Sequence, residues 1–232
     1  MGKIIRAKFK KEGDMIFISH LDLQRLLQRA FRRAGIDLAY SEGFNPHPKM
    51  SYGNALALGT ESQGEYVDIE IKDDITPEEF IEQISKQLPA GIQFTKAIEI
   101  TNETPSLSSI IDYGEYIFTI ELKRALSKEF VKGKIVDFMN KPNFFVEKKN
   151  KKGNIIEVDI RPLIRTFDMI NVEEDKLVLV AVLATGSKKN LNTNLFIPII
   201  LELFGIEMDP LDVDILRRDL YVCVDGEIET PF

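Results

Sequence analysis

The segment from Ser19 to Gly35 constrains the fold most, because it reads as an amphipathic helix with its own start and stop. Ser19 is a good N-cap residue, and Gly35 suits the left-handed backbone position that ends many helices. The apolar residues of this segment recur at helical spacing and form one face. They are Leu23, Leu26, Leu27, Ala30, Phe31 and Ala34. Strand-like segments on both sides of this helix indicate an α+β fold.

Residues 1–101 show strand and helix patterns in the order β-α-β-β-α-β. A second helix is expected over 76–88, since Thr76, Pro77 and Glu79 supply its start signals. This order is that of the ferredoxin-like unit. The four strands of this order are expected over 4–10, 37–41, 65–72 and 92–100, and a further short strand is expected over 55–58.

Residues 102–109 are polar, contain Pro105 and are predicted to be a linker. Residues 110–232 are predicted to repeat the same order as a second unit. Residues 159–170, which contain Pro162, are expected to be irregular or to form a short turn, and Pro198 is expected to bend or delay the last helix. The sequence thus predicts two tandem ferredoxin-like (βαββαβ) units, the second with an inserted hairpin. Its elements are expected at 116–122, 127–140, 144–149, 155–160, 176–184, 192–204 and 212–224.

The polar face of the first helix is rich in arginine and is the first candidate for a binding site. At 100° per residue its four arginines fall within a sector about 100° wide. Guanidinium groups recognise phosphate and carboxylate through paired hydrogen bonds. The alternative is an ordinary solvated face with cations near the helix C-terminus. The four residues are Arg25, Arg29, Arg32 and Arg33.

The loop that follows, from Tyr40 to Tyr52, is the second candidate. Pro46 and Pro48 restrict the backbone on both sides of His47. Rigid display of polar and aromatic groups suits ligand recognition, whereas the alternative is a connection with ordinary turn chemistry. The residues that this loop is predicted to present to a ligand are Tyr40, Phe44, Asn45, His47 and Lys49.

Five segments of the chain resemble the radical-SAM-linked domain of unknown function. That family occurs alone and also fused behind a cobalamin-binding-like and radical SAM domain. The resemblance covers nearly the whole chain and implies an accessory module of unassigned activity, with a separate radical SAM protein as a candidate partner. With Cys223 as its one cysteine, the chain cannot hold the CxxxCxxC cluster of a radical SAM enzyme. The segments are 17–23, 29–35, 40–49, 56–62 and 159–164.

Charge is distributed unevenly along the sequence. Residues 1–52 contain ten Lys and Arg against five Asp and Glu, whereas residues 53–104 contain three against eleven. A basic site in a chain with a formal net charge of -7 suits a specific anionic ligand better than indiscriminate polyanion binding.

Other site classes are not expected. A single cysteine excludes an internal disulfide and any multi-cysteine metal or iron–sulfur site. His20, Asp22 and His47 contain a ligand set known for iron, but Asp22 is well placed to serve in helix capping, so no metal and no cofactor are expected. The sequence has no signal peptide and no apolar run of membrane length, which predicts a cytoplasmic protein without membrane contact.

Two function hypotheses remain. In the first, the chain is a non-catalytic accessory module that binds RNA or a nucleotide-like anion through residues 20–52. In the second, it is an enzyme or small-anion-binding domain that acts on a phosphorylated or carboxylated substrate with His47 and the helix arginines. Arg161 and Arg165 of the second half would add to the site if the two halves face each other. No residue is assigned a catalytic role.

Overall fold

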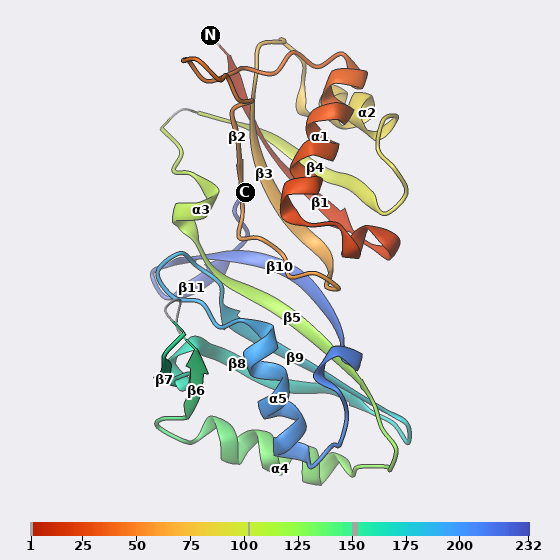
Figure 1. Cartoon of the computed structure of the whole chain (residues 1–232), viewed down its shortest axis with the longest axis vertical. Coiled ribbons are helices and arrows are strands. Elements are labelled where there is room, and N and C mark those ends of the chain that lie inside the picture. Colours follow the sequence, from red (N-terminus) through yellow and green to blue (C-terminus); the bar gives the residue numbers. More distant parts are fainter. Residues whose placement is uncertain (1, 102, 150–152) are drawn as a thin grey trace. The chain divides into compact units, whose positions relative to one another are not determined.

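The structure is a computed structural model that describes residues 2–101, 103–149 and 153–232. It has a mixed α+β fold, and the chain divides into two compact units (Figure 1). Unit 1 comprises Met1–Asp112 and Leu216–Phe232, and unit 2 comprises Tyr113–Ile215. No helix in the described ranges is long and apolar enough to cross a membrane.

Unit 1 is built on a large, mostly antiparallel sheet. Its central strand β1 pairs antiparallel with β3 on one side and with β4 on the other. The short strand β2 also pairs antiparallel with β3, whereas the C-terminal strand β10 pairs with β3 in parallel and β11 pairs with β10. The strands are β1 (Lys3–Lys11), β2 (Met50–Tyr52), β3 (Glu61–Ile71), β4 (Ile92–Ile100), β10 (Asp214–Val224) and β11 (Glu227–Glu229).

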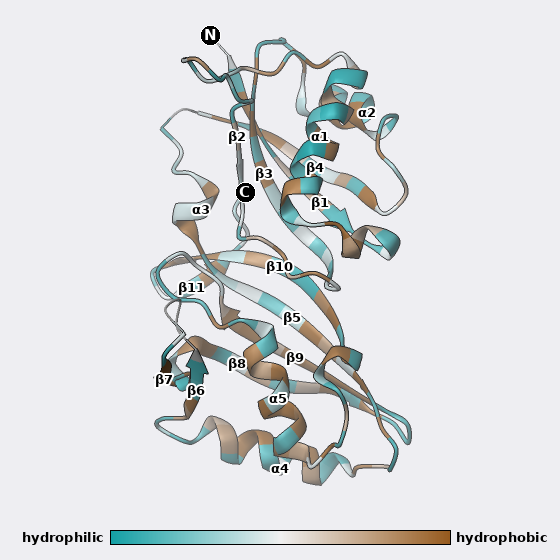
Figure 2. Ribbon diagram, in the orientation of Figure 1, coloured by the Kyte–Doolittle hydropathy of each residue, from teal (hydrophilic) through white to brown (hydrophobic). Residues whose placement is uncertain are grey.

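Helices α1 (His20–Ala34) and α2 (Pro77–Ser85) cover one face of this sheet. The N–H of Asp22 donates to the Ser19 side chain at 3.1 Å, and Gly35 ends the helix with a φ of 75°. Both termini of α1 are therefore as predicted. Figure 2 shows the hydrophilic and hydrophobic residues that alternate along α1. The buried apolar residues of α1 are Leu23, Leu27, Ala30 and Phe31.

A capping box begins α2, as the sequence predicts. The N–H of Thr76 donates to the Glu79 carboxylate at 2.8 Å, and the N–H of Glu79 donates to Thr76 Oγ1 at 3.2 Å. These bonds satisfy two donors that the first helical turn leaves without partners. The start of α2 is thus determined locally.

The opposite face of the unit 1 sheet is covered by the C-terminal segment and the short helix α3 (Leu107–Ile110). Arg6 of β1 is buried there and forms a two-point ion pair with Asp68 of β3, with nitrogen–oxygen distances of 2.7 and 2.9 Å. The same guanidinium donates to the carbonyl of Pro231 at 2.8 Å. The ring of Phe232 lies 5.3 Å from that of Tyr66. Alternate residues of β3 on this face are therefore buried rather than solvated.

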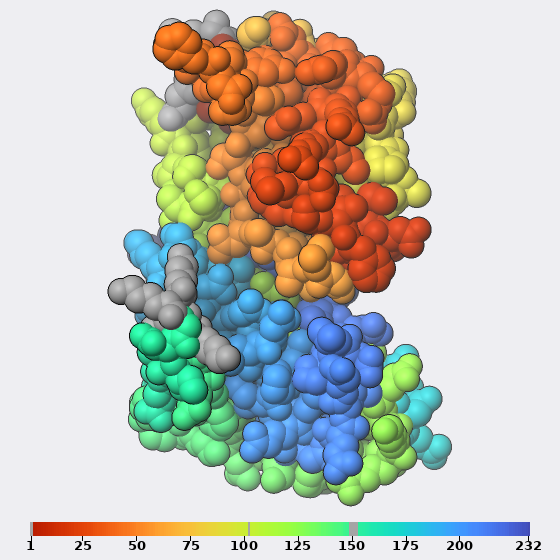
Figure 3. Space-filling model, in the orientation of Figure 1, coloured from red at the N-terminus to blue at the C-terminus, as the bar shows by residue number. Residues whose placement is uncertain are grey.

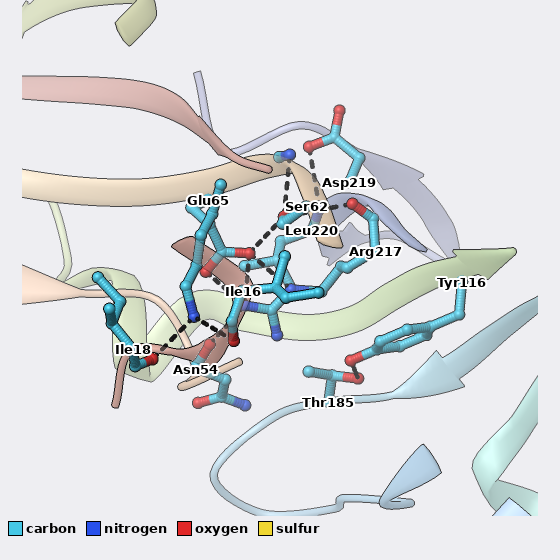
Figure 4. Close-up of polar contacts among 12 residues, drawn as sticks. Ile16, Ile18, Asn54, Ser62, Glu65, Tyr116, Thr185, Arg217, Asp219 and Leu220 are labelled. Carbon is cyan, nitrogen blue, oxygen red and sulfur yellow. Dashed lines mark hydrogen bonds and ion pairs between the residues drawn. The ribbon is translucent and has the colours of Figure 1, made fainter. Parts of the chain in front are cut away.

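A second buried ion pair joins β3 to β10. Arg217 Nε donates to Glu65 at 2.8 Å, and the carboxylate also accepts a bond from the Ser62 hydroxyl (Figure 4). Arg217 donates in addition to the carbonyl of Asn54 at 2.9 Å. The Arg217 side chain is 1% exposed and that of Glu65 is 9% exposed, so each charge depends on the other.

Unit 2 contains three antiparallel strands of the large sheet, with β9 lying between β5 and β8. The helices α4 and α5 and the hairpin of β6 and β7 pack against these strands, and their apolar residues share one core. The turn of the hairpin, predicted around residues 151–154, lies mostly outside the described residues. The elements are β5 (Ile111–Glu121), α4 (Lys128–Met139), β6 (Phe145–Lys149), β7 (Ile155–Asp159), β8 (Ile164–Val172), β9 (Lys176–Ala184) and α5 (Thr193–Phe204).

The structure corrects several expectations in this half of the chain. The strand expected over 212–224 does form, but it pairs with β3 of unit 1, so a tandem pair of ferredoxin-like units is not confirmed. Residues 164–172 form β8 rather than irregular structure, because Pro162 is confined to a 3-10 turn before the strand. Pro198 lies inside α5, which nevertheless begins at Thr193.

Two smaller differences concern the first half. The strands expected over 37–41 and 55–58 are replaced by isolated bridges at Leu38 and Tyr40 and by β2. Asn102 of the predicted linker lies outside the described residues. The division of the chain into separate domains at 102–109 stays a prediction.

The Glu65–Arg217 pair leads to a prediction about stability. Glu65→Gln leaves the buried Arg217 guanidinium without its counterion, so the free energy of unfolding should fall by about 3–5 kcal/mol. Urea denaturation followed by circular dichroism measures this change. Glu82→Gln is the matched control, because its carboxylate pairs with Lys86 at the surface. It should change stability by no more than about 0.5 kcal/mol. Equal effects of both variants would contradict a special role for the buried pair.

Candidate functional site

The solvent face of α1 forms one wall of a hollow in unit 1. The other wall is the turn between α2 and β4, and the hollow has a volume of about 680 Å³. Arg25, Arg29 and Arg33 line it, so three of the four predicted helix arginines come together. We call this hollow the arginine groove. Its complete lining is Ile18, Asp22, Arg25, Leu26, Arg29, Arg33, Lys86, Gln87, Leu88 and Pro89.

The arginines of the groove are not neutralised by the acidic residues of 61–82. Arg25 forms an exposed pair with Asp22 of its own helix at 3.3 Å, and exposed pairs of this kind are weak. Arg33 donates to the carbonyl of Gln87 at 2.6 Å. Within the described ranges, Arg29 has no ion pair and no side-chain hydrogen bond. Lys86 forms an exposed pair with Glu82 at 2.8 Å, so among the described residues Arg29 and Arg33 are the lining cations without a carboxylate partner.

The lining of the groove also contains half-buried apolar side chains. Ile18, Leu26 and Leu88, together with Pro89, present carbon atoms to the same hollow that the guanidinium groups line. Apolar surface next to cations suits a ligand that combines anionic groups with flat, weakly polar rings. Simple inorganic anions would use only the cations.

Arg32 is exposed on α1 but does not line the groove. Its position on the helix is offset from the row of the other three arginines. Arg32 forms no ion pair with any residue in the described part of the chain. Arg32 therefore belongs to the same basic helix face without belonging to the hollow.

The predicted loop is a hydrogen-bonded hairpin that projects from unit 1. Ser41 N–H donates to the carbonyl of His47 at 2.8 Å, and His47 N–H donates back to the Ser41 hydroxyl at 3.0 Å. Tyr40 forms a bridge with Pro48. In Figure 3 the loop is the orange projection at the upper left. Phe44, near the tip of this loop, is fully exposed.

The other predicted loop residues share this exposure. Asn45 and His47 are exposed, and Lys49 forms a partly exposed pair with Glu70 at 3.0 Å. None of the residues 40–49 lines the arginine groove, and Figure 1 shows the loop at the side of unit 1 away from α2. The site predicted as one surface is thus two separate surfaces.

Arg161 and Arg165 lie in unit 2, and their contacts there are structural. The guanidinium of Arg161 donates to the carbonyl of Met139 at 2.8 and 3.0 Å and to that of Ile164 at 2.9 Å. All three of its nitrogens are used in this way, so Arg161 holds the end of α4 to the start of β8. Arg165 lies 5.5 Å from the centre of the Tyr113 ring.

Sequence reasoning missed Lys86 and Gln87, which complete the groove. They come from the turn after α2, more than fifty residues from the arginines, and only packing of α2 beside α1 brings them together. The one available signal was local: Pro89–Gly91 marks a turn at the end of a helix whose position on the sheet was unknown.

A buried polar cluster behind α1 was also missed. Lys11 is 2% exposed, and its ammonium donates to the carbonyl of Ile18 at 3.0 Å. His20 packs its ring against that of Tyr52 at 5.2 Å, in an edge-to-face arrangement. The amide nitrogen of Gln24 lies 2.9 Å from His20 Nε2. An amide nitrogen only donates, so His20 Nε2 accepts and the ring is neutral.

The pKa of His20 agrees with this hydrogen bond. Burial lowers the pKa of His20 below its ordinary value of 6.5, and the charges of Lys11 and Arg217 lower it further against the opposing effect of Glu65. His20 therefore binds a proton less readily in the folded protein than in the unfolded chain. Stability should be complete above pH 6.5 and decline as the pH falls from 6.5 toward the lower folded pKa.

His20→Asn tests this pH dependence. Free energies of unfolding from urea titrations between pH 8 and pH 5 should decline less steeply below pH 6.5 for the variant than for the wild type. His47→Asn is the matched control, since the chain has two histidines and His47 is exposed. Identical slopes for the wild type and His20→Asn would contradict a lowered pKa for the half-buried His20 ring.

A family model described as an uncharacterized protein conserved in bacteria (DUF2344) matches residues 4–193. No curated protein matches the sequence. The match ends before most of α5 and the C-terminal strands, but it includes the whole of α1, the loop and the groove-lining turn.

Solved structures show remote likeness. The chain is similar to a chain of a Cbf5–Nop10–Gar1 complex, with 10% identity, a TM-score of 0.44, and coverage of 94% of this chain and 47% of that one. A chain of an archaeal box H/ACA sRNP Nop10–Cbf5 complex is 8% identical, with a TM-score of 0.41 and coverage of 94% of this chain and 46% of that one. An unknown protein from Galdieria sulphuraria is 12% identical, with a TM-score of 0.27 and coverage of 97% of this chain and 100% of that one. The chain spans about half the length of the first two chains, and likeness at these scores carries no functional assignment.

Proposed function

The chain belongs to the family of uncharacterized proteins conserved in bacteria, and we propose that it binds RNA through the arginine groove of unit 1. The observation that carries this proposal is the lining of the groove by Arg25, Arg29 and Arg33 together with Lys86. Guanidinium groups bind phosphate oxygens in pairs, and the combined field attracts a polyanion. In this proposal the chain acts as a binding module and not as the catalyst of a reaction.

The electrostatic state of the groove supports binding of phosphates. Its internal pairs are exposed, and exposed ion pairs contribute about 0–1 kcal/mol, so a phosphate can compete for Arg25 at little cost. Arg29 has no competing ion pair among the described residues. Cations concentrated on one helix of an acidic chain favour specific over diffuse anion binding.

The apolar lining supports RNA over a small inorganic anion. Unpaired bases of RNA expose flat, weakly polar faces that pack against apolar side chains and against guanidinium planes. Leu26, Leu88 and Pro89 offer such a surface within reach of the same ligand. A phosphate ion alone would leave these side chains without contacts.

The loop is proposed as a second contact for a longer RNA. It presents the exposed rings of Tyr40 and Phe44 next to Asn45, His47 and Lys49, a combination of aromatic, amide and cationic groups typical of single-strand recognition. The enzyme alternative would join His47 to the helix arginines, but His47 lies outside the groove. A partnership with a separate radical SAM protein rests on the sequence resemblance and stays a prediction.

Binding of a fluorescent single-stranded RNA tests the groove. Arg29→Gln removes one charged donor and should weaken binding by about 1.5–3 kcal/mol. It should also reduce the slope of log K against log salt concentration by about 0.7. Arg32→Gln is the matched control, with the same charge change on the same helix outside the groove. Equal losses for both variants would show diffuse attraction in place of a specific site.

The loop contact is tested with Phe44→Ala. The side chain is fully exposed, so thermal stability should change by no more than about 0.5 kcal/mol. Binding of a 20-nucleotide RNA should weaken by about 1–3 kcal/mol through the loss of one stacking partner. Unchanged binding of the long RNA would remove the loop from the proposed interface and leave the groove unaffected.

A further inference from the structure

We infer that the arginine groove takes three successive phosphates of one RNA strand, so that its ligand class is a single strand of at least three nucleotides. This inference rests on the proposed RNA binding and makes it specific. It separates the groove from a mononucleotide pocket, which would need one phosphate site, and from a duplex-binding surface.

The spacing of the arginines matches that of a nucleic-acid strand. Arg25, Arg29 and Arg33 follow one another at intervals of four residues, and a helix rises about 1.5 Å per residue. Their backbone positions are thus about 6 Å apart along the axis. Successive phosphates of an extended nucleic-acid strand are separated by a similar distance. Each arginine can therefore serve one phosphate without strain in the strand.

The direction of the three side chains is also shared. Four residues correspond to about 400° of helix rotation, so each arginine is turned by only about 40° from the one before it. All three accordingly line one hollow, whereas Arg32 does not. A row with this small rotation follows a single strand along the length of the helix.

The row has defined ends. At the N-terminal end Asp22 pairs with Arg25 at 3.3 Å, and its carboxylate would repel a further phosphate beyond Arg25. At the C-terminal end Arg33 is held by the carbonyl of Gln87 at 2.6 Å, which directs its guanidinium toward the turn between α2 and β4. The row of three arginines is therefore bounded by the Asp22 carboxylate at one end and by the hydrogen bond of Arg33 to Gln87 at the other.

The lining of the groove requires unpaired bases. Leu26 of α1 and Leu88 and Pro89 of the turn lie in the same hollow as the arginines, so a strand with its phosphates on α1 has apolar surface beside it. In a duplex the bases are stacked and paired inside the helix, where they cannot reach this surface. The groove volume of about 680 Å³ also falls in the range of pockets for small ligands and short segments.

The test is a length series of 5′-phosphorylated oligouridylates with one to five nucleotides, measured by competition against a fluorescent single-stranded RNA at several salt concentrations. In this series each nucleotide adds one phosphate. Affinity and salt slope should increase up to three nucleotides, with about 0.7 added to the slope for each phosphate, and then stay level at four and five. Arg29→Gln should remove one step of the slope, and Arg32→Gln should remove none.

The outcomes separate this inference from the function on which it rests. If uridine monophosphate binds as tightly as the trinucleotide, or if a duplex competes as well as a single strand of equal length, the three-phosphate inference is overturned and RNA binding stands. If neither the oligonucleotides nor long RNA binds the wild type, the proposed function is wrong as well. Melting curves for both variants should coincide with the wild type, which excludes unfolding as the cause of a loss.

Discussion

The buried ion pair between Glu65 and Arg217 is the constraint on which unit 1 depends. It joins β3 to β10 across 152 residues of sequence, and neither charge has enough water around it to exist without the other. Arg6 and Asp68 repeat this arrangement on the same sheet, where Arg6 also binds the carbonyl of Pro231. The C-terminal segment is thereby required for a unit that the N-terminal half begins, and the residues of unit 2 are inserted between them in the sequence.

Helix α1 separates stability from binding by using its two faces differently. Leu23, Leu27 and Phe31 are buried in the core of unit 1, whereas Arg25 and Arg29 remain exposed along the groove. Because these exposed arginines contribute little to the stability of the fold, their guanidinium groups are available to contact a ligand. Strong exposed charges with weak internal pairs are what a phosphate-binding surface needs. Local stability comes from the cap at Ser19 and the core contacts instead.

The candidate site was predictable only in part. The arginine row follows from helical periodicity, and three of its four members do line one hollow. The loop of 40–49 was predicted to share a surface with them from its rigid display of polar and aromatic groups, but it projects from another side of unit 1. Lys86 could not be found by the same reasoning, since nothing local shows which turn packs beside α1. Proximity along the chain was a poor guide to proximity in space.

Interactions within about four residues of sequence account for the features that were predicted correctly: the capped N-termini of α1 and α2, the left-handed Gly35 that ends α1 and the alternation of β3. The tertiary structure alone decided the partner of β10 and the burial of Arg6, Asp68 and Arg217. From the sequence alone, a charged residue in an alternating strand is predicted to face solvent, because the segment that covers it cannot be identified locally. That covering comes from the last residues of the chain, and the pairing that makes it possible is a long-range property of packing and charge.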